Sequence, residues 1–173
     1  MNLDGYTRRE AIVDYLNNKT HPVSGTELAK HFGVSRQIIV QDIALLRAEN
    51  RNILSTNKGY VLFHPQEKRS GCTAVIMVKH TANQTLDEMR SIVDYGGCML
   101  DVFIDHDLYG QIRVDLLIND IKDAEEFCEK MRNSTSKPLK VLTEDCHYHT
   151  ITAPSQKALE LILNELKNLQ ILL

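Results

Sequence analysis

The sequence lacks any long apolar run, and its first residues contain no apolar core of the kind that marks a signal peptide. No stretch approaches the roughly 20 consecutive apolar residues that a membrane-spanning helix needs. These two absences predict a cytoplasmic protein with no membrane segment. The composition, 43% hydrophobic and 25% charged over 173 residues, is that of an ordinary globular chain, long enough for one or two small domains.

Cysteine is sparse and shows no pairing pattern. Four cysteines lie far apart in the chain, and none belongs to a C-x-x-C pair (Cys72, Cys98, Cys128 and Cys146). The sequence therefore predicts reduced, mostly buried thiols and no disulfide framework.

Basic residues predominate slightly in the first part of the chain and acidic residues in the second. Residues 1–64 contain eight Lys/Arg and six Asp/Glu, whereas residues 65–173 contain twelve Lys/Arg and seventeen Asp/Glu. A mildly basic first part is compatible with contacts to the phosphates of a nucleic acid.

Three helices are predicted in the first fifty residues. The first runs from Thr7, as its capping residue, to Leu16, and the second from Thr26 to Phe32. Gly33 ends the second helix, and Ser35 caps a third that continues to about Asn50. Two short helices joined through a glycine turn to a longer one are the helix-turn-helix pattern. The apolar side of the third helix is predicted to consist of Ile38, Ile39, Ile43, Leu45 and Leu46.

The start of the third helix is where such proteins contact base edges and phosphates. Arg36 and Gln37 suit guanine and adenine edges respectively, and Gln41 lies one turn further along the same face. Ser35 could donate to a phosphate as well as cap the helix. These four residues are therefore candidates for DNA binding.

A wing is predicted after the third helix. The segment 53–62 contains two short strands around Asn57-Lys58-Gly59, and Lys58 at the tip of this hairpin could contact the DNA backbone. The combination resembles the winged helix-turn-helix domains of many bacterial repressors. The alternative is a three-helix packing module with no role in DNA binding.

A polar segment containing proline and glycine, residues 65–71, is predicted to be a linker between domains 1–64 and 72–173. The second domain reads β-α-β-β-α-β-α, an α+β domain of ferredoxin-like type with an additional helix. The caps predicted for its three helices are Asn83, Asn119-Asp120 and Ser155, and the first of these helices is expected to continue to Tyr95.

The motif His147-Tyr148-His149 lies in the last predicted strand. Because side chains alternate along a strand, both imidazoles would point to one face. His80, at the end of the first strand, and Glu88, in the following helix, would approach them if the first and last strands are neighbours. Three imidazoles and a carboxylate suit Zn(II), Fe(II), Ni(II) or Mn(II). The alternative is an ordinary polar strand face.

These residues, with several others around them, resemble the three-histidine (3H) domain. That domain follows a winged helix in niacin-responsive transcriptional repressors of NAD biosynthesis and niacin uptake, in the same order as here. The chain departs from the family at Glu144-Asp145-Cys146, where the family tends to have a glycine-containing stretch, and at Asp107, where it often has proline. The matching segments are His80, Glu88, Tyr95–Gly97, Asp101-Val102, His106–Gly110 and Leu142–Ile151.

The resemblance implies that a divalent metal is bound by His80, Glu88, His147 and His149. It also implies nicotinic acid as co-repressor, and a homodimer on a palindromic double-stranded operator. Effector binding is further expected at His106, Tyr109 and Arg113, although His106 could equally shape its own loop. Arg113 is suited to a carboxylate.

Two other functions fit the same residues. A metal-sensing regulator would have the same architecture, with the metal itself as effector. A metal-dependent hydrolase would use the same ligands around a catalytic ion, but no general base or nucleophile motif stands apart from them, and a DNA-binding front favours regulation over catalysis.

Overall fold

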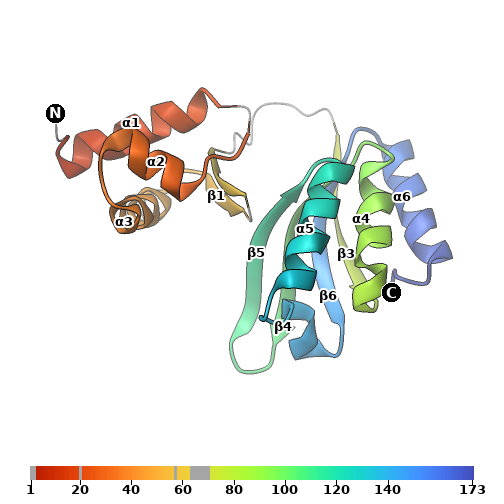
Figure 1. Cartoon of the computed structure of the whole chain (residues 1–173). Helices are drawn as coiled ribbons and strands as arrows, with labels where there is room; N and C mark the ends of the chain where they lie inside the picture. The colour runs from red at the N-terminus through yellow and green to blue at the C-terminus, as the bar shows by residue number, and fades with distance from the viewer. Residues whose placement is uncertain (1–2, 20, 57, 63–70) are drawn as a thin grey trace. The chain divides into compact units, whose positions relative to one another are not determined.

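The computed structural model describes all residues except 1–2, 20, 57 and 63–70, and it divides the chain into two compact units, Met1–Glu67 and Lys68–Leu173 (Figure 1). The predicted linker, residues 65–71, lies outside the described residues apart from Gly71. No helix in the described part of the chain is long and apolar enough to cross a membrane.

The first unit contains the three predicted helices and the predicted hairpin. Their bounds are α1 (Gly5–Asn17), α2 (Gly25–Phe32), α3 (Arg36–Ala48), β1 (Ile53–Thr56) and β2 (Gly59–Leu62). Gly33 ends α2 in the left-handed conformation at φ 66°, and the Ser35 side chain caps α3 by accepting from the Ile38 amide. The helix-turn-helix junction is therefore as predicted.

Two details of the first unit differ from prediction. Asp4, not Thr7, caps α1, because its carboxylate accepts from the Thr7 amide and the helix begins two residues earlier than Thr7. Leu45 was expected on the apolar side of α3 but is exposed. Buried Asp42 lies on the inner side of α3 instead, where Arg8 of α1 donates to its carboxylate at 2.6 Å. This ion pair joins α1 to α3.

The wing is attached to the helices through Val23. Its amide donates to the Tyr60 carbonyl, and the Tyr60 amide donates to the Val23 carbonyl, each at 2.8 Å. A Cβ atom at Gly59 would lie 2.3 Å from the Val23 carbonyl oxygen, so only glycine fits at this crossing. The hairpin next to α3 is thus held by backbone hydrogen bonds.

The second unit has the predicted order β-α-β-β-α-β-α, with two short 3₁₀ turns, η1 and η2, inserted. One face of its four-stranded antiparallel sheet is covered by α4, α5 and α6 (Figure 1). The elements are β3 (Cys72–Lys79), η1 (Ala82–Gln84), α4 (Thr85–Val93), β4 (Cys98–His106), β5 (Gly110–Ile118), α5 (Ile121–Asn133), η2 (Leu139–Thr143), β6 (Cys146–Ala153) and α6 (Gln156–Asn168).

The strands lie in the order β3-β6-β4-β5, so the first and last strands are neighbours, as predicted. The α+β class is confirmed. The strand order refines the ferredoxin-like description, in which the first and third strands of the sheet are interior. Here the interior strands are the fourth and the second, β6 and β4. The last strand, which carries the two histidines, is consequently enclosed on both sides.

The helix caps of the second unit agree with prediction at Asp120 and Ser155 but not at Asn83. Thr81 and Gln84 form a capping box ahead of α4, and Asn83 lies inside the 3₁₀ turn between them. The helix ends at Val93 rather than Tyr95, before Gly96 at φ 75°.

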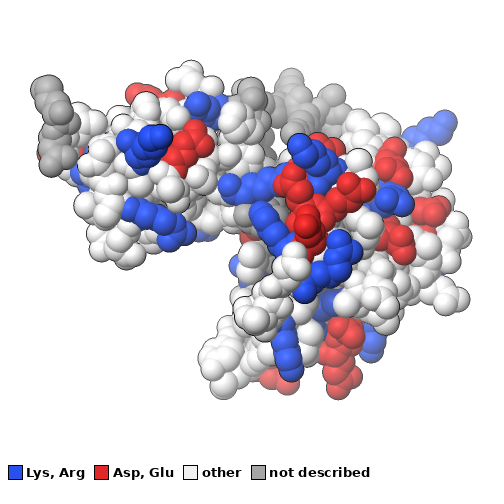
Figure 2. Space-filling view, in the orientation of Figure 1, with Lys and Arg blue, Asp and Glu red and all other residues white. Residues whose placement is uncertain are grey.

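The outer surface of the second unit's helices is strongly charged. Figure 2 shows Asp and Glu side chains gathered over these helices, interspersed with Lys and Arg. On α5 the exposed positions include Lys122, Glu125, Glu129 and Lys130. This mixed, solvated surface is typical of an amphipathic helix whose inner side packs on a sheet.

Candidate metal centre and nucleic-acid interface

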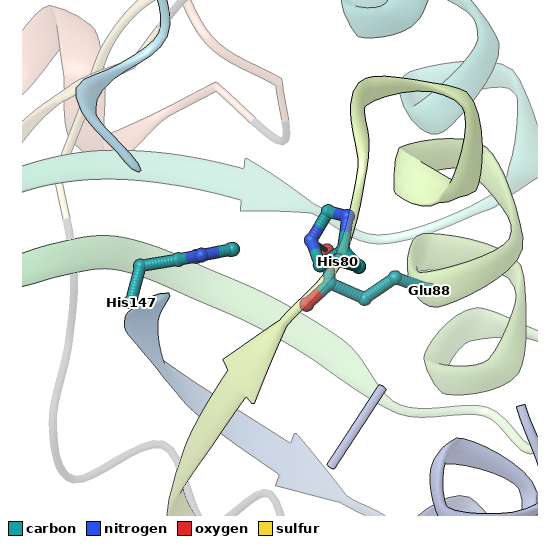
Figure 3. Close-up of side chains that lie close together, drawn as sticks. All are labelled: His80, Glu88 and His147. Carbon is teal, nitrogen blue, oxygen red and sulfur yellow. Dashed lines mark ion pairs between the residues drawn. The ribbon is translucent and has the colours of Figure 1, made fainter. Parts of the chain in front are cut away.

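The candidate metal centre begins where β3 ends. His80 follows the last residue of β3, and its Nε2 atom lies 2.9 Å from Oε2 of Glu88, which comes from the first turns of α4. Figure 3 shows His147 of β6 pointing toward these two side chains. The potential ligand atoms of His80, Glu88 and His147 all lie within 4.8 Å of one another.

The two β6 histidines lie side by side, as the alternation of strand side chains predicted. The ring centroids of His147 and His149 are 4.8 Å apart, and those of His147 and His80 are 4.9 Å apart. His149 Nε2 lies 3.3 Å from Glu88 Oε1, next to the cluster of three. The register that pairs Val78 with His147 produces this arrangement.

Each of the three imidazoles is oriented by a backbone carbonyl. Nδ1 of His80 lies 2.8 Å from the Thr81 carbonyl oxygen. Nδ1 of His147 donates to the Asp145 carbonyl at 3.0 Å, and Nδ1 of His149 donates to the Asp101 carbonyl at 2.6 Å. Because a carbonyl only accepts, Nδ1 of His147 and of His149 carries a proton, and in the neutral form of each ring the Nε2 lone pair faces the centre. His80 Nδ1 lies 3.2 Å from Lys140 Nζ as well. Metal-binding histidines are typically oriented in this way.

Several polar atoms at the centre are buried without a hydrogen-bond partner among the described residues: His80 Nε2, His149 Nε2 and Glu88 Oε1. The four side chains are only 1% to 5% exposed. Buried polar groups are normally paired, since leaving one unpaired costs about 1–3 kcal/mol. Both imidazole nitrogens lie within 3.3 Å of the Glu88 carboxylate. This arrangement fits a divalent ion, whose ligands lie at about 2.0–2.2 Å from it.

The charges of the cluster depend strongly on one another. Burial would raise the pKa of the Glu88 carboxyl, but the adjacent His149 and His80 imidazoles bring it well below its usual range. Burial would lower the pKa of His149, but the Glu88 carboxylate outweighs burial and raises it. At His147 burial, reinforced by His149, outweighs the smaller raising effect of Glu88 and lowers the pKa to about 4. His147 is therefore a neutral imidazole at pH 7, the form that binds metals.

Lys140 of η2 is a buried residue of this region that the sequence analysis missed. Its Nζ donates to the His80 carbonyl at 2.6 Å and lies 3.8 Å from Asp145 Oδ1, and burial lowers the pKa of its ammonium group. It thus joins the segments that carry His80 and His147. The sequence signal was a single lysine among the apolar residues of Leu139–Leu142.

The three residues predicted to bind the effector make their contacts away from the candidate metal centre. His106 Nδ1 accepts from the amides of Leu108 and Tyr109, at 3.2 and 3.4 Å, which is the loop-shaping role. Tyr109 is 73% exposed. Arg113 forms an ion pair with Asp101. Among the described contacts none of these three touches the four candidate ligands, so their role in effector binding stays a prediction.

The candidate nucleic-acid interface is the exposed start of α3. The side chains of Arg36, Gln37 and Gln41 are all exposed, and Ser35 is exposed while its hydroxyl oxygen caps the helix. Lys58 is half-buried in the hairpin, where its amide donates to the Thr56 hydroxyl at 3.2 Å. Asn57 lies outside the described residues. The structure thus leaves the predicted recognition residues accessible on one helix.

Fold and site together define a winged helix-turn-helix protein with a histidine-rich regulatory domain. Residues 8–61 match the model of an HTH domain, and residues 73–173 match that of the 3H domain. The chain belongs to the 3H-domain family. It is 38% identical over 160 residues to a protein of Thermotoga maritima named "Probable transcription repressor NiaR", covering 92% of this chain and 90% of that protein.

A second relative matches the chain over its full length. The "Transcription repressor NadR" of Bacillus subtilis is 34% identical over 179 residues, covering 100% of this chain and 97% of that protein. Both similarities run through the two units in the same order, so the two-domain organisation is shared over nearly the full length.

Proposed function

We propose that the chain is a transcription repressor that binds double-stranded operator DNA through α3 and the wing. The observation that carries this proposal is the exposed row of Arg36, Gln37 and Gln41 on a helix that follows a glycine turn. Its relatives named as repressors, which match the chain in both domains, support the same function. Such a repressor acts in the cytoplasm of a bacterium, and it is a regulator rather than an enzyme.

We further propose that the repressor responds to nicotinic acid as co-repressor and controls genes of NAD biosynthesis or niacin uptake. A divalent transition metal (Zn, Ni, Fe or Mn) would be held by His80, Glu88, His147 and His149. When bound, the metal supplies a Lewis-acidic anchor for the carboxylate or ring nitrogen of the effector. The three unpaired buried atoms described above support this assignment.

The proposed repressor acts as a homodimer on a palindromic operator. Two recognition helices enter successive major grooves when they lie about 34 Å apart. An effector that favours one spacing therefore changes operator affinity by shifting a population of conformations.

A titration of operator affinity tests the proposal. Labelled promoter DNA from niacin-uptake genes would be titrated with the metal-loaded chain, with and without nicotinate, and with nicotinamide as the control compound. Nicotinate is expected to tighten binding. Unchanged affinity in nicotinate would eliminate the co-repressor proposal while leaving DNA binding intact.

A metal sensor is the second candidate, and one observation favours it. All four candidate ligands are nearly completely buried, which suits an ion that is itself the signal. This candidate predicts operator affinity that follows metal concentration and ignores pyridine acids. A metal-dependent hydrolase is less well supported, since Glu88 would have to serve both as ligand and as general base.

A further inference from the structure

The pairing of β4 with β6 is irregular beside His149. Met99 pairs with Ile151 and Phe103 pairs with Tyr148, so three residues of β4 lie opposite two residues of β6. The additional residue is a β-bulge, a feature that often re-aims a side chain next to a functional site. The two β6 residues opposite this bulge are His149 and Thr150.

Asp101, in the middle of the bulge, makes a hydrogen bond to each of these two residues. Its backbone carbonyl accepts from His149 Nδ1 at 2.6 Å, and its carboxylate Oδ1 accepts from the Thr150 amide at 2.8 Å. The carboxylate thus takes the place of a carbonyl in the strand pairing. The backbone carbonyl is then available to orient the imidazole.

Arg113 of β5 holds this carboxylate from the other side. Its guanidinium pairs with Asp101 Oδ2, donates to Thr150 Oγ1 at 3.0 Å and lies 3.9 Å above the Phe103 ring. Asp101 is only 6% exposed, whereas the Arg113 side chain is 38% exposed. Phe103 in turn stacks on Tyr148 at 5.0 Å. These side chains lie on the sheet face that the helices do not cover.

We propose that Asp101 and Arg113 are positioning residues for the metal ligand His149. The ion pair fixes the bulge, the bulge fixes the Asp101 carbonyl, and the carbonyl sets the tautomer and ring angle of His149. The uncovered sheet face is thereby connected to the metal centre on the opposite face. This inference rests on the proposed metal binding. Outer-shell partners of metal-binding histidines typically change metal affinity by about 10–100-fold when they are replaced.

The competing explanation is an ion pair that only stabilises the sheet. The two explanations differ in what they predict for metal affinity. A structural pair changes the stability of the metal-free chain and leaves Zn²⁺ affinity as it was. A positioning pair changes the affinity for Zn²⁺ even in a fully folded variant.

The experiment measures Zn²⁺ affinity of the full chain by competition with a chromophoric chelator. The variants are Arg113→Gln and Asp101→Asn, each with a matched control that makes the same change elsewhere in the unit. Arg90→Gln alters an exposed arginine on α4, and Asp105→Asn alters an exposed aspartate on β4. The absorption spectrum of bound Co²⁺ reports ligand geometry, and thermal unfolding of the metal-free variants reports folding.

Both test variants are expected to bind Zn²⁺ at least about 10-fold more weakly and to show an altered Co²⁺ spectrum. Both control variants are expected to have the Zn²⁺ affinity and the Co²⁺ spectrum of the unchanged chain. Arg113→Lys should recover part of the affinity, because a lysine can still pair with Asp101. The Zn²⁺ affinity of the double variant should equal that of the single variant that binds Zn²⁺ less tightly, since both substitutions break the same ion pair.

Folded Arg113→Gln with unchanged Zn²⁺ affinity would overturn the inference and leave the metal centre standing. Failure of the unchanged chain to bind Zn²⁺ would instead overturn the metal centre, and the inference with it. The two failures are thus distinguishable.

Discussion

The two units use their polar residues in opposite ways. Four of the five candidate DNA-binding residues of the first unit lie close together in the sequence and are exposed at the start of one helix: Ser35, Arg36, Gln37 and Gln41. The candidate metal ligands of the second unit come from the residue after β3, from α4 and from β6, between residues 80 and 149, and they are buried. The comparison teaches that an interface for a large, charged partner needs only local structure. A centre for a small ion needs the complete fold.

The largest expected effect is on metal binding, and it tests whether the buried cluster is a centre at all. Glu88→Gln should weaken Zn²⁺ affinity by more than about 100-fold, beyond the range of outer-shell changes, because it removes the only charged ligand. Competition with a chromophoric chelator measures it. Asp87→Asn, an exposed neighbour on α4, is the control. Equal losses in both variants would point to a general charge effect.

The metal-free cluster should make stability depend on pH. Burial lowers the pKa of His147 to about 4, below its unfolded value of 6.5. The unfolded chain therefore gains a proton between pH 6.5 and 4 that the folded chain does not. Stability should fall by about 2–3 kcal/mol as the pH is lowered through this window. Urea denaturation in the presence of chelator measures the fall.

His149 should have the opposite effect on the pH dependence of stability, and at higher pH. Its pKa in the folded chain is raised by Glu88 against the effect of burial, so its contribution is complete below pH 6.5 and is lost as the pH rises through the folded pKa. His147→Gln should flatten the acid side of the profile and leave this alkaline side. A profile with an unchanged acid side in His147→Gln would contradict the assignment.

A smaller effect is expected at the DNA interface. Arg36→Ala should weaken operator binding by about 1–3 kcal/mol and relax specificity at one base pair, since a bidentate contact to guanine contributes about that amount. Arg51→Ala is the control, because Arg51 pairs with Glu10 beyond the other end of α3, about 20 Å along the helix axis. Fluorescence anisotropy with operator and mutated DNA measures both. Equal weakening by the two changes would indicate nonspecific charge attraction.

The smallest effect concerns the turn before His147 and His149, the candidate metal ligands of β6. Glu144 has φ 52° and Asp145 has φ 66°, a conformation that residues other than glycine adopt at a cost of about 1–2 kcal/mol. Glu144→Gly should stabilise the chain by up to about 1 kcal/mol. The substitution relieves the backbone strain, but glycine loses more conformational entropy on folding and so offsets part of the gain. Thermal unfolding measures it. Destabilisation would show that the Glu144 side chain has a role of its own.

Much of the fold followed from local patterns. The helix-turn-helix could be predicted because Gly33 and Ser35 act on their immediate neighbours. The pairing of first and last strands could be predicted from topology. The strand order could not, because element order and apolar patterning are compatible with several arrangements of four antiparallel strands. The capping role of Asp4 was missed because Thr7 offers an equally good local signal.

The clustering of the four candidate ligands could be predicted from the sequence, but the residues around them could not. His147 and His149 are linked by the strand period, and His80 and Glu88 are linked by one β-α connection. The Lys140 side chain donates to the backbone carbonyl of His80, and the backbone carbonyl of Asp101 accepts from His149. No spacing in the sequence encodes such contacts. For Arg113 the sequence suggested an effector contact, and the structure shows an ion pair with Asp101.

X-ray absorption spectroscopy of the zinc-loaded chain tests the central claim most directly, because it counts the atoms bound to the ion. We expect a shell of three imidazole nitrogens and one carboxylate oxygen at about 2.0–2.2 Å, with the outer scattering of three imidazole rings. Glu88→Gln should remove the carboxylate. A sulfur atom at about 2.3 Å, which would bring in Cys146, or a shell without imidazole scattering, would contradict it.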